Sequence, residues 1–314
     1  MSGNYGCMKK RHIFLALILA AFASSEANAW SRETHMTTGA IAFDDLQRNS
    51  PALLAALEPI IAAHPDRARL DASLNGLTGR ARARAMFEWL ARWPDDVRGT
   101  AYDHPKWHYE LRVISSWSAI WPFRNGTASQ GFDQNFRILA DTSAQSADRA
   151  VALGWLLHIV GDIQQPLHAA HWASWTYPMS DRAGTLGFVR RVRGGAPIEL
   201  HEFWDQILDR AVPPDATARA WAQPLQRTWP RIRLPELGYA GTPQAQFAHW
   251  LDESLALAWM AGYRDAFLRA TRDAVAAPIA SPRYNMISNR IAQRRVATGG
   301  YRIADTLRMA FKAP

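Results

Sequence analysis

Apolar residues recur three or four positions apart in several stretches of the chain, which is the spacing of one face of an α-helix. This pattern predicts helices over residues 53–63, 81–92, 147–160, 200–208, 247–274 and 301–311. We expect Pro59 to kink or split the first of these helices, because proline removes a backbone donor. The Gly299-Gly300 pair is expected to separate the last helix from the chain before it.

Strand signals are few. Residues 185–192, between Gly184 and Gly194, predict a short strand or one arm of a hairpin. Proline and glycine mark loops around residues 94–106, 122–131, 176–197, 212–215 and 228–243. With no repeat of fixed period and no low-complexity linker, the pattern predicts the all-α class. We expect one multi-helix domain over residues 30–314, with long irregular loops and at most a short hairpin.

The first 29 residues have the pattern of a secretory signal peptide. Basic residues at positions 9–11 precede an uncharged, mostly apolar run over residues 13–25, and Ala27 and Ala29 are the small residues of a cleavage site. The run is too short to span a membrane. A buried first helix is the alternative interpretation. Cleavage between Ala29 and Trp30 predicts an exported protein, periplasmic or extracellular.

Composition narrows the class of protein. The chain has 314 residues, of which 48% are hydrophobic, so it can bury a large core and is not disordered as a whole. The formal charge is +8, and removal of three basic residues and one acid with the signal peptide leaves +8 − 3 + 1 = +6. A basic surface favours anionic partners. Cys7 is the only cysteine, which excludes an intramolecular disulfide framework and a cysteine-based zinc finger.

Histidine and aspartate pairs stand out in two of the expected helices. His158 and Asp162 are four positions apart, so they project from one helix face and could share a metal such as zinc. Their neighbours are almost entirely apolar, and a buried, hydrogen-bonded His–Asp pair explains this segment equally well. His201 and Asp205 repeat the spacing, with His168 between the two pairs. The repetition favours a metal cluster.

Further candidate ligands lie nearer the N-terminus. Asp95 and His108 each have an ordinary alternative interpretation, a loop carboxylate and a surface histidine. Trp30 becomes the first residue once the signal peptide is removed, and its free α-amino group and carbonyl oxygen can chelate a metal ion. An α-amino group with a pKa of about 7.7–8.0 loses its proton readily beside a cation. Signal removal would thereby complete a metal site, and His35 follows Trp30 by five residues.

Together these motifs resemble the S1/P1 nuclease family, zinc-dependent nucleases grouped with the bacterial zinc phospholipases C. Five family patterns recur here in the same order: Trp30 and His35; Trp93, Asp95 and Arg98; His108 and Tyr109; His158, Asp162 and His168; and Leu200, His201, Trp204 and Asp205.

The resemblance implies a helical domain of the phospholipase C/P1 nuclease type that holds three Zn²⁺ ions. By family likeness the sets are Asp95, His108, His158 and Asp162; Trp30, His35 and Asp162; and His168, His201 and Asp205. Asp162 would bridge the first two ions and act in catalysis with them, since paired zinc ions present hydroxide that attacks phosphorus. Arg98 would steady charge on the phosphoryl group, or orient Asp95 or Asp162, and the two roles are compatible.

Two departures from the family pattern concern the substrate. Nuclease members carry an aspartate and an asparagine that contact a base, and the matching positions here are Leu111 and Ala196. We still expect a hydrolase acting on single-stranded DNA or RNA, with 3′-nucleotides as further candidate substrates. The alternative is a phospholipase C-type enzyme acting on phospholipid head groups, with exposed Trp172 and Trp175 touching the membrane. A non-enzymatic zinc-binding protein is the third interpretation, and no obligate protein partner is evident.

The loop between the two central motifs carries a basic run. Arg190, Arg191 and Arg193 could attract a polyanion or could form a solvated loop, and the solvated interpretation is favoured. His171 is expected near the ligands or at the access to them. His64, His104 and His249 are expected to be surface or ordinary structural residues.

Overall fold

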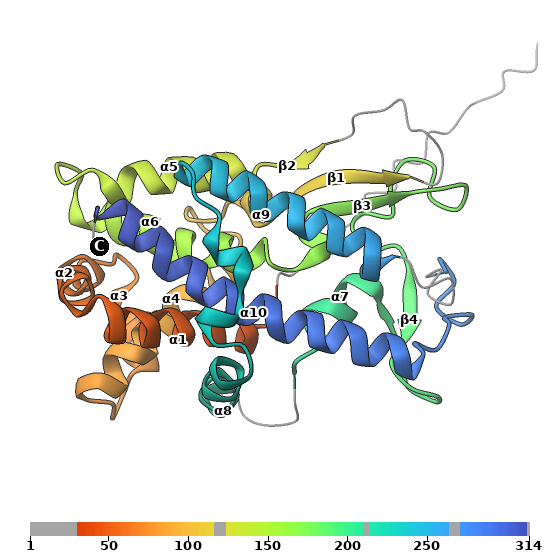
Figure 1. Cartoon of the computed structure of the whole chain (residues 1–314), viewed down its shortest axis with the longest axis horizontal. Helices are drawn as coiled ribbons and strands as arrows, with labels where there is room; N and C mark the ends of the chain where they lie inside the picture. The colour runs from red at the N-terminus through yellow and green to blue at the C-terminus, as the bar shows by residue number, and fades with distance from the viewer. Residues whose placement is uncertain (1–29, 116–123, 210–213, 264–270, 313–314) are drawn as a thin grey trace, which may run out of the picture.

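Helices dominate the computed structural model, which describes residues 30–115, 124–209, 214–263 and 271–312 (Figure 1). The α-helices of the described residues are α1 (Arg32–Asn49), α2 (Pro51–Ala62), α3 (Arg67–Ser73), α4 (Gly79–Asp96), α5 (Ala128–Ala140), α6 (Ser146–Asp162), α7 (Leu200–Asp205), α8 (Pro214–Thr228), α9 (Pro243–Leu257) and α10 (Pro282–Ala310). Short 3-10 turns join several of them: η1 (Pro105–His108), η2 (Pro166–His168), η3 (Arg231–Arg233) and η4 (Pro235–Gly238). The expected all-α class is therefore confirmed. None of the described helices is long and apolar enough to cross a membrane.

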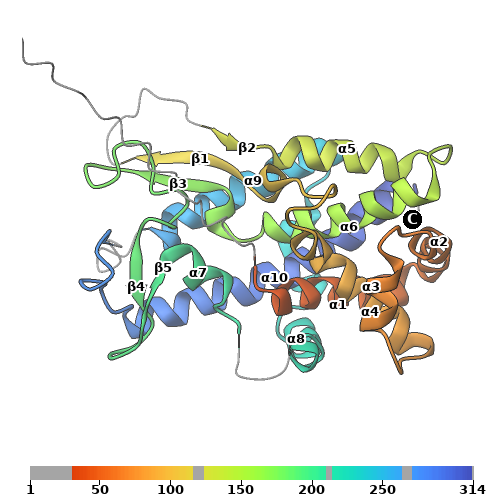
Figure 2. The ribbon, with the colours of Figure 1, turned by 180° about the vertical axis from the view of Figure 1, so that it is seen from behind.

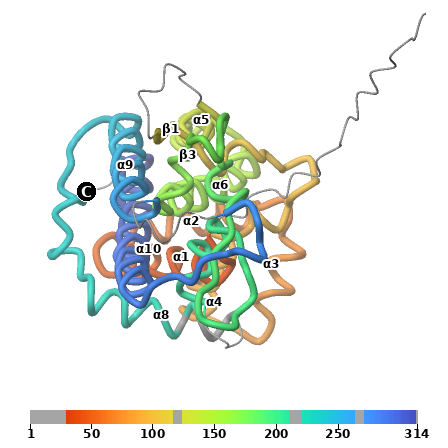
Figure 3. Tube along the Cα trace, turned by 90° about the vertical axis from the view of Figure 1, so that its right-hand side faces the viewer, coloured from red at the N-terminus to blue at the C-terminus, as the bar shows by residue number. Residues whose placement is uncertain are grey.

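Helix α1 lies at the centre of the molecule. It packs against α4, α8 and α10, while α6 packs against α4 and α5 (Figures 2 and 3). The helix begins at Ser31, whose hydroxyl accepts the backbone N–H of Thr34. Nearly every residue from Thr34 to Leu46 is buried, polar ones included. A helix buried on all sides has no apolar stripe, so the periodicity of the sequence did not predict it.

Two glycines allow α1 to approach its neighbours closely. A Cβ atom at Gly39 would lie 2.4 Å from the carbonyl oxygen of Phe87 in α4, and one at Gly300 would lie 2.5 Å from the Cβ atom of Ile41. The expected break at Gly299-Gly300 is wrong, because α10 continues through both residues. Glycine is required at both positions because the backbone of one helix lies directly against the neighbouring helix and leaves no room for a Cβ atom.

The other helix predictions are confirmed with changes at their ends. Pro59 does not split the first helix as the sequence allowed, because α2 runs from Pro51 to Ala62 with Pro59 inside it. Helix α4 extends to Asp96 through Pro94, which the sequence had placed in a loop. Helix α9 is followed by one π-helical turn, η5 (Ala258–Gly262), and residues 271–281 are irregular. The prediction of helix to residue 274 is therefore wrong for residues 271–274, and residues 264–270 lie outside the described part of the chain.

Strands contribute two small sheets. The hairpin of β4 (Phe188–Arg190) and β5 (Pro197–Glu199) confirms the predicted strand at residues 185–192. A second sheet, with the order β2-β1-β3, was not predicted: β1 (Glu110–Ser115) pairs antiparallel with β2 (Asn125–Gly126) and parallel with β3 (Ala170–Ala173). The parallel pair joins η1 to η2, because β1 begins two residues after His108 and β3 two residues after His168.

Candidate metal centre

The nine predicted ligand residues come from separate elements whose ends meet. His35 lies on α1, Asp95 at the end of α4, and His158 and Asp162 on the last turn of α6. The 3-10 turns η1 and η2 supply His108 and His168, α7 supplies His201 and Asp205, and Trp30 directly precedes α1. Eight of these residues are buried and Asp95 is nearly so, which places a dense set of polar groups inside an apolar core.

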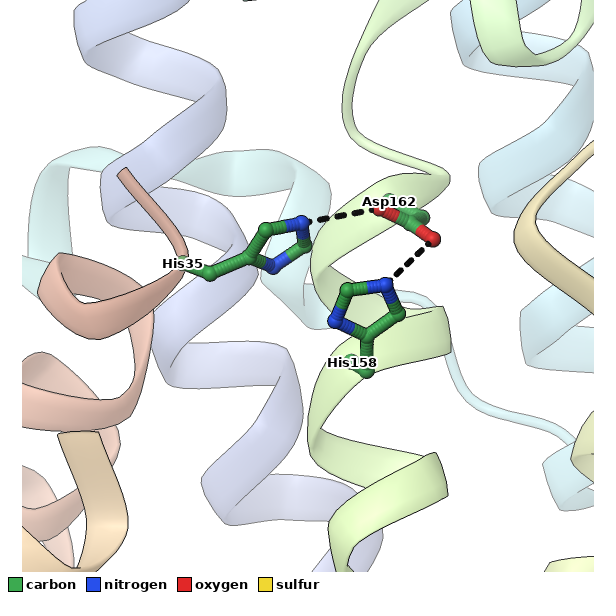
Figure 4. Close-up of side chains that lie close together, drawn as sticks. All are labelled: His35, His158 and Asp162. Atoms are coloured by element: carbon green, nitrogen blue, oxygen red, sulfur yellow. Dashed lines mark ion pairs between the residues drawn. The ribbon is translucent and has the colours of Figure 1, made fainter. Parts of the chain in front are cut away.

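Asp162 lies at the middle of the first group. Its Oδ1 atom is 3.0 Å from His35 Nε2 and its Oδ2 atom is 3.1 Å from His158 Nε2, so one carboxylate faces two imidazoles (Figure 4). The rings of His35 and His158 stack with their centroids 4.0 Å apart. Gly161 makes room for this arrangement, since a Cβ atom there would lie 3.2 Å from His35 Nδ1.

Asp95 and His108 complete the set around Asp162. His108 Nδ1 is 3.1 Å from Asp162 Oδ2, and Asp95 Oδ1 is 3.8 Å from both His108 Nδ1 and His158 Nε2. Arg98 donates to the same Asp95 oxygen, from Nη2 at 2.7 Å and from Nε at 3.2 Å. The arginine therefore orients the carboxylate of Asp95, and the role predicted for it on the phosphoryl group stays a prediction.

The third group lies where α6 ends and α7 begins. The rings of His168 and His201 stack with centroids 5.0 Å apart, and His201 Nε2 is 3.4 Å from Asp205 Oδ2. Helix α7 has only six residues, and the buried Trp204 anchors it by donating its indole N–H to the hydroxyl of Tyr284 on α10. The other Asp205 oxygen accepts the side-chain amide of Gln165 at 2.9 Å.

Backbone carbonyls orient three of the imidazoles. His158 Nδ1 is 2.8 Å from the Ala91 oxygen, His168 Nδ1 is 2.6 Å from the His108 oxygen, and His201 Nδ1 is 2.8 Å from the Ala183 oxygen. A carbonyl only accepts, so each Nδ1 carries the proton and each Nε2 offers its lone pair to the cluster. Metal-binding histidines in proteins are held in this way.

The donor set fits metal ions. Three groups each offer three ligand atoms within 4.8 Å of one another: His35, His158 and Asp162; Asp95, His108 and His158; and His168, His201 and Asp205. The first two groups share His158, and Asp162 also contacts the second. His168 Nε2 has no hydrogen-bond partner among the described residues, and His35 Nε2 and Asp162 Oδ1 face only each other, as an ion pair at 3.0 Å. Buried nitrogen and oxygen atoms in that state are costly unless they bind a cation.

The charges in the cluster are strongly coupled. Burial alone would raise the pKa of Asp162, but the adjacent His158 and His35 outweigh it and hold that pKa well below the usual range. Burial lowers the pKa of His108 and, together with the charge of His158, that of His35. Burial, together with the charges of Asp162 and Asp95, raises the pKa of Asp205 well above its ordinary value. A carboxylate that costs this much to ionise gains most from a nearby cation.

Trp30 is held between α6 and α7. Its indole N–H donates to the carbonyl of Gly161 at 3.0 Å, and the next backbone N–H, that of Ser31, donates to the carbonyl of Asp205 at 3.1 Å. These contacts place its main chain beside the residues that flank both Asp162 and Asp205. The use of its amine and carbonyl as metal ligands stays a prediction.

Two supporting residues were missed by the sequence reasoning. Gln165 is fully buried and orients Asp205, and only its place inside the central motif could have indicated it. Asp181 accepts the backbone N–H of Trp172 at 2.7 Å and begins a turn in which Arg182, Ala183 and Gly184 all have positive φ. Burial raises the pKa of Asp181 to about 7. This turn presents the Ala183 carbonyl that holds His201, and no helical or strand period indicates it.

Other predicted positions are resolved as follows. Asp95 rather than its neighbour Asp96 faces the histidines, since Asp96 Oδ2 lies 2.9 Å from Arg92 Nε. Leu111 is buried in the core and Ala196 is exposed, so neither position offers a side-chain hydrogen bond. His171 is buried on β3, with its Nδ1 2.7 Å from the Ser180 hydroxyl.

The basic run of Arg190, Arg191 and Arg193 in the β4–β5 hairpin is only partly exposed to solvent. Arg190 donates to the carbonyls of Gly195, Ala274 and Val275. Arg191 donates to the carbonyl of Phe203 and lies over its ring, and Arg193 is exposed. The favoured interpretation therefore holds for Arg193 alone.

Comparison with known proteins agrees with the geometry. No individual curated protein matches the chain. The sequence profile described as S1/P1 Nuclease matches residues 30–312, nearly the whole chain, including every element of the metal centre. The chain belongs to the S1/P1 nuclease family.

Proposed function

We propose that this protein is a three-zinc phosphodiesterase that hydrolyses single-stranded DNA or RNA, with 3′-nucleotides as further substrates. The observation that carries the proposal is the convergence of three buried histidine–carboxylate groups in one centre. Nitrogen and oxygen ligands in sets of three or four suit Zn²⁺. Bound zinc would lower the pKa of coordinated water and polarise the phosphate oxygens, which supplies a nucleophile at neutral pH.

The protein residues would divide the work as follows. Asp95, His108, His158 and Asp162 would hold one ion, and His35 and Asp162 would hold a second with the amine and carbonyl of Trp30. His168, His201 and Asp205 would hold the third.

Arg98 is the proposed catalytic cation. Its guanidinium uses two donors on Asp95, and a guanidinium carries five N–H groups in a fixed fork. The positive charge of the guanidinium at the edge of the cluster would offset the negative charge that grows on the phosphoryl oxygens in the transition state. The contact with Asp95 keeps the arginine in place for this role.

Export and maturation belong to the same proposal. Residues 1–29 lie outside the described part of the chain, and we propose that they are removed between Ala29 and Trp30. The buried position of Trp30 beside Gly161 and Asp205 supports a mature chain that starts there. The exported product would be periplasmic or extracellular, with a formal charge of +6 that favours a polyanionic substrate.

The alternative is hydrolysis of phospholipid head groups. It is favoured by one observation: Leu111 is buried and Ala196 carries only a methyl group, so neither position can contact a base edge through a polar side chain. A lipid substrate needs no such contact.

One experiment separates the two substrates. The mature protein is loaded with zinc and incubated side by side with single-stranded DNA, single-stranded RNA and phosphatidylcholine vesicles, each with and without a chelator. Chelator-sensitive cleavage of the nucleic acids is the expected result. Cleavage of phosphatidylcholine alone would overturn the nucleic-acid assignment, and no cleavage of any substrate by protein that carries three ions would overturn the enzymatic one.

A further inference from the structure

Exposed apolar side chains gather at one end of the molecule. Among the described residues, six large ones lie on three neighbouring segments, the loop at residues 174–180, the turn η5 and the segment at residues 271–281. They are Trp175, Met179, Trp259, Met260, Val275 and Ile279, with exposed fractions from 42% for Ile279 to 88% for Trp175. Scattered single apolar residues are normal on a protein surface, whereas a group of this size indicates an interaction site.

The three segments form one continuous surface. The Trp172 ring, at the start of the loop, stacks on Trp259 of η5 with centroids 6.0 Å apart. The Arg272 guanidinium lies 5.3 Å from the centroid of the Tyr177 ring, which joins the loop to the third segment. All three segments lie at the end where α9 stops and α10 begins, the right-hand end in Figure 1, which faces the viewer in Figure 3.

The charge of this end is positive. Within the described residues of the three segments and the two positions on either side of each, Arg182, Arg272 and Arg283 are exposed, against one exposed acid, Asp273. Tryptophan and long apolar side chains with neighbouring arginines suit the interface of an anionic bilayer.

We propose that this end of the protein docks on anionic lipid bilayers. Trp175, Met179, Trp259, Met260 and Val275 would enter the interfacial region, and the surrounding arginines would contact the lipid phosphates. Strand β3, which carries Trp172 into this surface, begins two residues after the candidate ligand His168. Docking would therefore hold the metal centre at a fixed distance from the membrane. The inference concerns binding and is independent of which phosphodiester the centre cleaves.

The test is co-sedimentation of the mature chain with phosphatidylcholine vesicles, prepared with and without phosphatidylglycerol. We expect binding to the anionic vesicles at low salt that exceeds binding to pure phosphatidylcholine by about tenfold or more and falls as salt is added. The double variant Trp175→Ser/Val275→Ser should bind at least about tenfold more weakly. The matched control is Ile232→Ser, since Ile232 is 93% exposed on η3, beside α1 and the later part of α10.

Folding of each variant is checked by its circular dichroism and thermal melting, which do not depend on turnover. Equal loss of binding in the Ile232 variant, or absence of binding to anionic vesicles by the folded wild-type protein, would overturn the proposal. A concentration-dependent dimer that is abolished by the double variant, without any vesicle binding, would assign the surface to a second copy of the chain instead. Failure of the protein to cleave nucleic acid leaves all of these outcomes unchanged.

Discussion

Replacing Gln165 with leucine should weaken the third metal site selectively. The Gln165 amide donates to Asp205 Oδ1 at 2.9 Å and its oxygen accepts the Leu167 N–H, all in a region with no solvent exposure. Leucine keeps roughly the same volume but removes the donor. Asp205 then becomes harder to ionise and freer to rotate, because this hydrogen bond opposes the effect of burial on its pKa.

The size of the effect follows from the hydrogen bond. A hydrogen bond to a charged group contributes about 1.5–3 kcal/mol. Since every 1.4 kcal/mol corresponds to a factor of ten, the third ion should bind about 10- to 100-fold more weakly. The other two ions do not contact Asp205 and should bind as before.

The assay counts ions and measures their affinity. Native mass spectrometry gives the number bound at limiting zinc, and competition with a chromophoric chelator gives the dissociation constants. The matched control is Gln226→Leu, because Gln226 makes the same 2.9 Å amide contact with the carboxylate of Asp44, away from the histidines. Three ions bound with unchanged affinity in the Gln165 variant would refute the reasoning, as would an equal loss in the Gln226 variant.

Three further predictions address other parts of the molecule. A Met or tag retained before Trp30 should remove one ion, counted by native mass spectrometry, because the nitrogen of Trp30 is then a peptide nitrogen and cannot bind a metal as an amine. Three ions on the extended protein would exclude the N-terminal chelate. Arg98→Lys should keep all three ions but lower kcat by about 10²–10³, the usual cost of losing one stabilising donor; a kcat that is unchanged would leave the arginine a purely orienting role. Burial lowers the pKa of His64 to about 4, below its unfolded value of about 6.5, so as pH falls from 6.5 to 4 the unfolded chain takes up a proton before the folded one and stability is lost, by about 3 kcal/mol in all. Urea titrations at several pH values give the free energy of unfolding, and the His64→Phe variant should lack this part of its decrease between pH 6.5 and 4. An identical pH dependence in the wild type and the variant would contradict the assignment to His64.

The sequence predicted the mostly helical class of the fold, while the assignment of the metal ligands stays a prediction. Pairs such as His158 and Asp162 follow from helical spacing alone, and the family resemblance ordered the rest. Helix α1 was missed because burial on every side removes the apolar stripe on which such predictions depend. A Gly-Gly pair predicts a break in a helix, whereas the close packing of Gly300 against Ile41 is a tertiary property that the local sequence does not show.

The supporting residues of the site were beyond prediction for a related reason. Asp181 and Ala183 act on His201 through a turn of three left-handed residues, and nothing in the spacing of the sequence indicates which carbonyl will face which ring. Gln165 differs, since it lies inside a motif that was already recognised. Its role depends on the distance to a residue forty positions later.

The metal centre also has a mechanical consequence for the chain. It joins residues from the start of α1 to the end of α7, so each bound ion would close loops of many residues, as a cross-link does, and loop closure disfavours the unfolded state. Cys7 is the only cysteine, and no disulfide can form within the chain to serve that purpose. Resistance to unfolding and to proteolysis would then follow the concentration of free zinc, while changes in redox potential would leave it unaffected.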